Sequence, residues 1–145
     1  MLIAIIGENC VGKSTLAERL KTKIAAEVIS GKDYLRMAKS ESEAVMLFKA
    51  KLASAVEGEN IIYIISEKEH LALLPDKAVK VVVTAELELI KERFKARMRG
   101  ILPPPVEQML ERKHGMFNNE PCSFKINTAK DDTDALCEQI INYDA

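Results

Sequence analysis

A glycine-rich segment that ends in a lysine and a hydroxyl residue carries the clearest chemical signal in the sequence. The segment Gly7-Glu8-Asn9-Cys10-Val11-Gly12-Lys13-Ser14 fits the pattern G-x-x-x-x-G-K-[ST]. Glycine allows positive φ and close backbone approach, so successive N–H groups can point at phosphate oxygens. We expect Lys13 to reach the terminal phosphates of ATP, Ser14 to hold Mg²⁺, and Thr15 to contact the α-phosphate.

A second group of residues suited to phosphate chemistry is a cluster of arginines. Half of the arginines of the chain lie in the seven residues from Arg93 to Arg99. Arg93 and Arg97 are four residues apart and share one face of a predicted helix, and Arg99 precedes Gly100. Guanidinium groups match phosphate oxygens well. We expect Arg93 to bind the nucleotide, Arg97 to take part in catalysis, and Arg97 and Arg99 to bind substrate; the alternative is an ordinary solvated helix.

An acidic residue and an arginine follow the second predicted strand. Asp33 can orient or deprotonate an acceptor hydroxyl, or hold Mg²⁺ through water, and it suits a helix N-cap equally well. Arg36, one turn later, can bind a phosphate or carboxylate of the acceptor. The strand at 61–65 ends in Ser66-Glu67, where many phosphate-loop enzymes have an aspartate for Mg²⁺, and Glu67 can substitute for it.

The elements that position these residues are short β-branched strands that alternate with amphipathic helices. Continuous apolar strands of this kind predict a parallel sheet that is covered on both faces. Gly100 and the prolines at 103–105 end a helix and favour a lid hinge over a domain linker. The predicted strands cover residues 2–6, 28–29, 61–65, 79–83 and 123–127, and the predicted helices cover 14–27, 33–57 with a break near 40, 67–74, 86–98, 106–113 and a stretch from 131.

Composition limits the classes of protein that fit. The 145 residues suffice for one domain, 1–145, with 48% hydrophobic and 30% charged residues. A formal net charge of −1 argues against a broadly basic nucleic-acid binder. The three cysteines are widely spaced and form no zinc pattern, and no apolar run is long enough for a membrane span. We therefore expect a reduced, cytoplasmic protein with no nucleic-acid or membrane partner.

In motif order the chain resembles the small P-loop kinases, a group that includes shikimate kinase, nucleoside monophosphate kinases and adenylylsulfate kinase. The resemblance rests on the loop at 7–15, the strand and acidic residue at 29–36, the strand and arginine-bearing helix at 81–100, and the last strand and helix at 124–141. It implies an α/β three-layer P-loop NTPase fold, with helices on both faces of a five-stranded parallel sheet of order 2-3-1-4-5. It also implies acceptor-side helices at 31–58 and a short lid at 97–117.

The resemblance implies an enzyme that uses ATP and Mg²⁺ to phosphorylate a small-molecule hydroxyl or phosphate acceptor, such as a nucleotide, a nucleoside or a shikimate-like metabolite. Lys13, Asp33 and Arg97 would be its catalytic residues. The chain lacks the glycine run of shikimate kinase after the third strand and the full arginine set of a nucleoside monophosphate kinase. Two alternatives remain: a nucleotide-binding regulatory module with weak catalysis, and an NTPase that acts with a macromolecular partner. We expect a monomer or homodimer.

Overall fold

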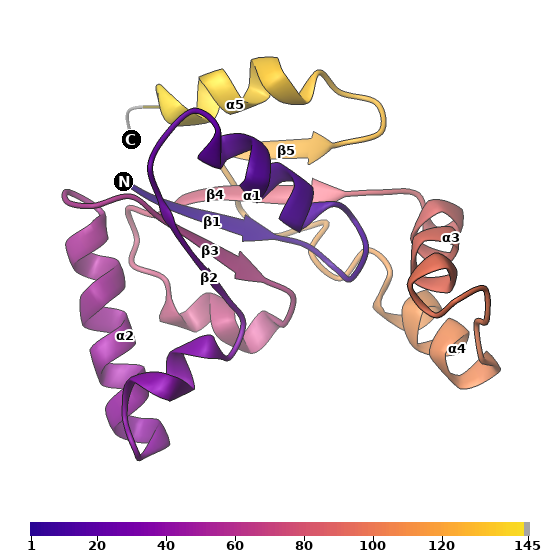
Figure 1. The fold of residues 1–145 in the computed structure, drawn as a ribbon, viewed down its shortest axis with the longest axis horizontal. Coiled ribbons are helices and arrows are strands. Elements are labelled where there is room, and N and C mark those ends of the chain that lie inside the picture. The colour runs from indigo at the N-terminus through magenta and orange to yellow at the C-terminus, as the bar shows by residue number, and fades with distance from the viewer. Residues whose placement is uncertain (144–145) are drawn as a thin grey trace.

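A parallel β-sheet forms the centre of the molecule (Figure 1). The computed structural model describes residues 1–143. Within these residues the sheet has five strands in the order β2-β3-β1-β4-β5, and every neighbouring pair is parallel. This confirms the predicted fold class and strand order. The strands are β1 (Leu2–Ile6), β2 (Glu27–Ser30), β3 (Ile61–Ile65), β4 (Val79–Thr84) and β5 (Phe124–Asn127).

Helices cover both faces of the sheet and so complete three layers (Figure 1). One face packs against α1 (Lys13–Lys21) and α5 (Thr133–Ile141). The other face packs against α2 (Glu41–Ala55) and two 3₁₀ segments, η1 (Asp33–Met37) and η2 (Lys68–Leu73). No helix within residues 1–143 has both the length and the apolar character needed to cross a bilayer.

The central strands are buried because both of their faces are covered. All residues of β1 and β3 are buried, which explains their continuous apolar sequences. Ile3 and Ile5 join the hydrophobic cluster under α1 and α5, whereas Leu2 and Ile6 join the cluster under α2. This alternation follows the two-residue period of a strand.

Of two predicted helix boundaries, one differs in the structure and one is confirmed. The helix predicted at 14–27 ends at Lys21, where the hydroxyl of Thr22 donates to the carbonyl of Arg19 at 2.6 Å. Hydroxyl groups at such positions compete with the helical hydrogen-bond pattern. The predicted break near Ser40 is confirmed, since Ser40 caps α2 by accepting a hydrogen bond from the N–H of Glu43.

The carboxyl ends of the strands meet at one edge of the sheet, from which a hairpin of two helices projects (Figure 1). The hairpin consists of α3 (Leu87–Arg97) and α4 (Pro104–Lys113), and its turn contains Arg99 and Gly100 with φ of 58° and 89°. Lys91 of α3 ties the two helices together, with its Nζ 2.8 Å from Oε1 of Glu111 and 3.9 Å from Oε1 of Glu107. The loops at this edge are the natural position for a ligand site in such a sheet.

Candidate active site

The loop between β1 and α1 needs glycine at both of its ends. A Cβ at Gly7 would lie 2.7 Å from Cγ2 of Val11 and 2.8 Å from the carbonyl oxygen of Val83. Gly12 has a φ of 105°, and a Cβ there would lie 2.8 Å from Oγ1 of Thr128. Any larger residue would therefore distort the loop, so the two glycines of the motif have a structural reason in this chain.

Two carbonyl groups of the loop accept hydrogen bonds from side chains outside the loop. Nη1 of Arg93 donates to the carbonyl oxygen of Cys10 at 3.0 Å, and Oγ1 of Thr128 donates to that of Val11 at 3.2 Å. Within residues 1–143, the backbone N–H groups of residues 8–12 donate to no protein acceptor. Consecutive N–H groups without protein partners, next to the N-terminus of a helix, form a binding site for an anion.

Lys13 begins α1 and is buried, with an exposed fraction of 7%. Its Nζ donates to the carbonyl oxygen of Glu8 at 2.7 Å. Burial lowers the pKa of Lys13 to about 8, and Cys10, Glu8 and Glu67 oppose this shift while Arg97 adds to it. Ser14 and Thr15 follow in the first turn of α1 and are exposed.

The loop and the helix α3 together line a cavity of about 370 Å³. Its walls include two of the three arginines of the cluster at 93–99, Arg93 and Arg97. Arg99 is exposed in the turn after α3 and does not line this cavity. The full lining comprises Cys10, Gly12, Thr15, Arg19, Arg93, Ala96, Arg97, Thr128 and Thr133.

Thr128 is a site residue that the sequence analysis does not single out. It lines the cavity and holds the loop carbonyl of Val11. Its position directly after β5 is the signal that could have identified it, because the carboxyl ends of parallel strands share one edge.

The predicted acceptor-side residues lie at the same edge of the sheet but outside this cavity. Asp33 begins η1, and its Oδ2 accepts a hydrogen bond from the N–H of Ser30 at 3.4 Å, a contact typical of a turn. The preceding turn is fixed because the buried Tyr63 donates its hydroxyl to the carbonyl of Gly31 at 2.8 Å. Arg36 is exposed on η1. Both side chains are exposed, and neither lines the cavity.

The remaining loop residues have distinct environments. The Glu8 side chain binds the chain segment that follows α4, with Oε1 2.9 Å from Nδ1 of His114. Asn9 is partly exposed, and Val11 is buried in the core beneath α1. Glu67, which follows β3, lies 3.6 Å from the ammonium of Lys113 at the end of α4.

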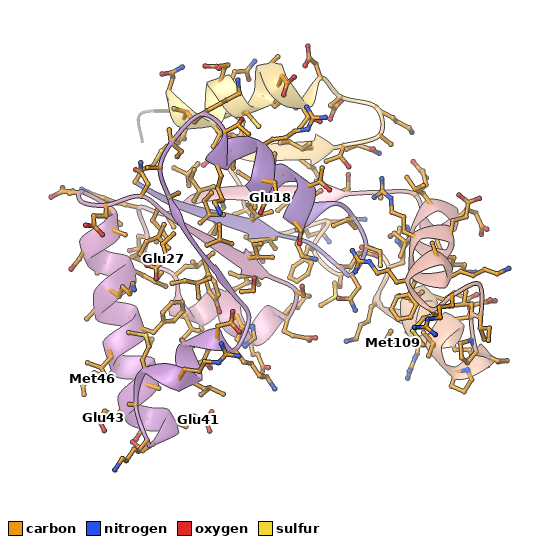
Figure 2. The ribbon with its side chains drawn as sticks, in the orientation of Figure 1. Glu18, Glu27, Glu41, Glu43, Met46 and Met109 are labelled. Atoms are coloured by element: carbon orange, nitrogen blue, oxygen red, sulfur yellow. The ribbon has the colours of Figure 1, made fainter. Side chains whose placement is uncertain are left out.

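The acidic residues at the start of α2 lie apart from this site. Figure 2 shows Glu41 and Glu43 at the outer end of α2, with Met46 nearby and also pointing away from the sheet. Met46 has an exposed fraction of 64%. These side chains do not line the cavity between the loop and α3.

Comparison with known proteins identifies the fold. No protein-family model and no curated protein matches the sequence. Among solved structures, the chain is similar to shikimate kinase from Acinetobacter baumannii in complex with shikimate, at 16% identity and a TM-score of 0.62, over 96% of this chain and 89% of that chain. It is also similar to the YorR protein of Bacillus subtilis in complex with phosphorylated GDP, at 25% identity and a TM-score of 0.64, over 97% and 94% of the two chains.

A third similar structure is deoxyadenosine kinase from M. mycoides with bound dATP, at 17% identity and a TM-score of 0.55, over 98% of both chains. The three similarities extend over nearly the whole of each chain. The protein therefore has the fold of the small P-loop kinases, which confirms what the resemblance of its motifs implies.

Proposed function

We propose that this protein is a kinase that transfers the γ-phosphoryl group of ATP to a small-molecule acceptor. The observation that carries the proposal is the cavity in which the glycine loop meets Arg93 and Arg97, next to the buried Lys13. Phosphoryl transfer depends mainly on positioning and on neutralising phosphate charge, and these are the capacities of such a cluster. The fold, shared with several kinases of small molecules, supports the same conclusion.

The donor side of the reaction is assigned to the loop and the two arginines. The loop N–H groups bind phosphate oxygens, and Lys13 exchanges its contact with the carbonyl of Glu8 for a phosphate oxygen. The exposed hydroxyl of Ser14, with the Glu67 carboxylate acting through water, fits the preference of Mg²⁺ for a few hard oxygen ligands beside phosphate. Bound Mg²⁺ supplies charge neutralisation, and Arg97 stabilises the charge on the transferred group.

The acceptor side is assigned to residues 31–58. An acceptor oxygen attacks the γ-phosphorus, the bond to the leaving ADP oxygen breaks, and Asp33 takes the proton when the acceptor is a hydroxyl. When the acceptor is itself a phosphate, Arg36 and Arg99 hold its charge. Residues 97–117 act as a lid that excludes water, so that the phosphoryl group reaches the acceptor.

The test is a screen for ATP-dependent phosphorylation of nucleosides, nucleoside monophosphates, shikimate-like acids and sugars. The expected result is one acceptor class that is phosphorylated by the wild type and not by Lys13→Ala. Asp33→Asn separates the sides of the site, since it should lower turnover while ATP affinity is retained. Near-normal turnover by Lys13→Ala would refute the proposed donor site.

One observation favours a second candidate, a nucleotide-binding regulatory module with weak catalysis. Ser66-Glu67 follow β3, where many phosphate-loop enzymes have an aspartate for Mg²⁺. The carboxylate of Glu67, which could substitute for that aspartate, is already paired with the ammonium of Lys113 at 3.6 Å. Isothermal titration that detects ATP binding, together with no transfer to any acceptor of the screen, would favour this candidate. A cytoplasmic location and a monomeric or homodimeric state stay predictions from the sequence.

A further inference from the structure

The α3–α4 hairpin is attached to the phosphate loop at two places. Within α3, Arg93 donates to the carbonyl of Cys10 at 3.0 Å. After α4, the Glu8 carboxylate makes two contacts: Oε1 lies 2.9 Å from Nδ1 of His114, and Oε2 accepts the N–H of Gly115 at 2.9 Å. The loop therefore contacts the hairpin both within α3 and just after α4.

The contact between Glu8 and the segment after α4 depends on features of both the loop and that segment. The Glu8 side chain is mostly buried, with 12% of it exposed, so its charge needs the partners that it has. Gly115 has a φ of 79°, and a Cβ there would lie 2.9 Å from Nδ2 of Asn118, so the turn that presents its N–H suits glycine. Sequence alone gives no sign of this contact, because Glu8 and His114 are 106 positions apart.

Glu8 also influences the lysine of the site. Its carbonyl oxygen accepts the hydrogen bond from Nζ of Lys13 at 2.7 Å, and its carboxylate favours the charged form of that lysine. Lys13 must leave this carbonyl to bind a phosphate, and the loop must keep its shape while the lysine moves. The contact of the Glu8 side chain with His114 and Gly115 is independent of Lys13, so it can hold the loop in place during that exchange.

From this geometry we infer that Glu8 is a positioning residue: through His114 and Gly115 it fixes the end of the α3–α4 hairpin to the phosphate loop and thereby sets nucleotide affinity. The inference rests on the proposed function, because it assigns the contact a role in binding the donor nucleotide. Among residues 1–143, the His114 side chain has Glu8 as its hydrogen-bond partner, so its effect on the nucleotide is exerted through Glu8. Loss of the contact would loosen the hairpin after α4, while Arg93 still ties α3 to the loop.

The experiment measures binding of a non-hydrolysable ATP analogue with Mg²⁺ by isothermal titration. His114→Ala and Glu8→Ala should each weaken binding on the order of tenfold, the effect of losing a hydrogen bond to a charged group. The double variant should bind no worse than Glu8→Ala alone, because Glu8→Ala already removes the contact that His114→Ala removes. His114→Asn should restore affinity, since the asparagine amide can donate from nearly the position of Nδ1. Gln108→Ala, an exposed change on α4, is the matched control.

Unchanged affinity in both single variants, or effects that multiply in the double variant, would overturn the inference. A second measurement needs no nucleotide: trypsin should cleave the α3–α4 hairpin faster in His114→Ala than in Gln108→Ala, with the thermal midpoints of the two variants alike. Equal cleavage rates would overturn the contact as a constraint on the hairpin. A wild-type protein that binds no nucleotide, yet shows the difference in cleavage, would instead refute the proposed function and the role in affinity, and leave only the attachment of the hairpin.

Discussion

Nucleotide affinity should fall steeply with pH above about 8 because Lys13 loses its proton in the nucleotide-free protein. Burial lowers the pKa of this lysine to about 8. A phosphate in place of the Glu8 carbonyl would raise that pKa, so binding takes up a proton once the lysine is neutral. The lysine is about 90% protonated at pH 7 and about 10% at pH 9, so affinity should drop roughly tenfold between these values.

The measurement is a titration of the same ATP analogue with Mg²⁺ at intervals between pH 7 and pH 9, where the phosphates stay ionised because their last pKa is about 6. Lys13→Arg is the control, since a guanidinium keeps its charge over this range and should abolish the pH dependence even if affinity is lower overall. A Cys10→Ser background removes the thiol of the loop from the comparison. Affinity that stays flat in the wild type, or falls equally in Lys13→Arg, would refute the assignment to Lys13.

Three further predictions concern stability. Lys13→Met should raise the free energy of unfolding at pH 7 by up to about 3 kcal/mol, at about 1.4 kcal/mol per pKa unit, because it removes a buried charge. The destabilisation of the wild type by this charge is complete below pH 8 and disappears as the pH approaches the ordinary lysine pKa of 10.5. Urea denaturation should therefore show that the stability difference between variant and wild type vanishes by about pH 10.5. Gly12→Ala should lower stability by about 1–3 kcal/mol and abolish nucleotide binding, because φ is 105° and the methyl group would meet Thr128; equal binding by titration would contradict this. Phe48→Ala, at a buried position of α2, should lower stability by about 3–5 kcal/mol, against less than about 0.5 kcal/mol for the exposed Met46→Ala in urea melts.

The fold could be predicted because its signals are local. Each central strand is covered on both faces, so its residues must be apolar throughout, and β1 and β3 are recognisable from sequence alone. The edge strand β2 is only partly buried, and its prediction as a two-residue stretch was correspondingly too short. The end of α1 was missed because the apolar spacing continues past Lys21 to Ile24, which packs against the core from outside the helix.

The site was predictable only where its residues are adjacent in sequence. The phosphate loop is one continuous motif, which marks Lys13 and both glycines as candidates, and Arg93 and Arg97 are marked by their spacing of one helical turn. His114 gave no signal, because its partner Glu8 comes from the other end of the chain and its role depends on how the hairpin folds back. The role of Thr128 depends in the same way on the pairing of β4 with β5. Long-range contacts of this kind are a property of the fold and leave no local pattern.

Several features of the loop are unfavourable in the protein by itself, and one ligand would relieve those that involve charge and unpaired N–H groups. Burial lowers the pKa of Lys13 and so disfavours its charge, and Arg97 adds a second positive charge nearby. Cys10 holds a φ of 67°, which is strained for a residue other than glycine, and the N–H groups of residues 8–12 have no protein acceptor among residues 1–143. A polyanion would restore the charge of the lysine, balance both cations and accept those N–H groups. A buried cation, a strained backbone and unpaired N–H groups therefore coincide in one loop. This coincidence is expected of a binding site, and packing alone does not explain it.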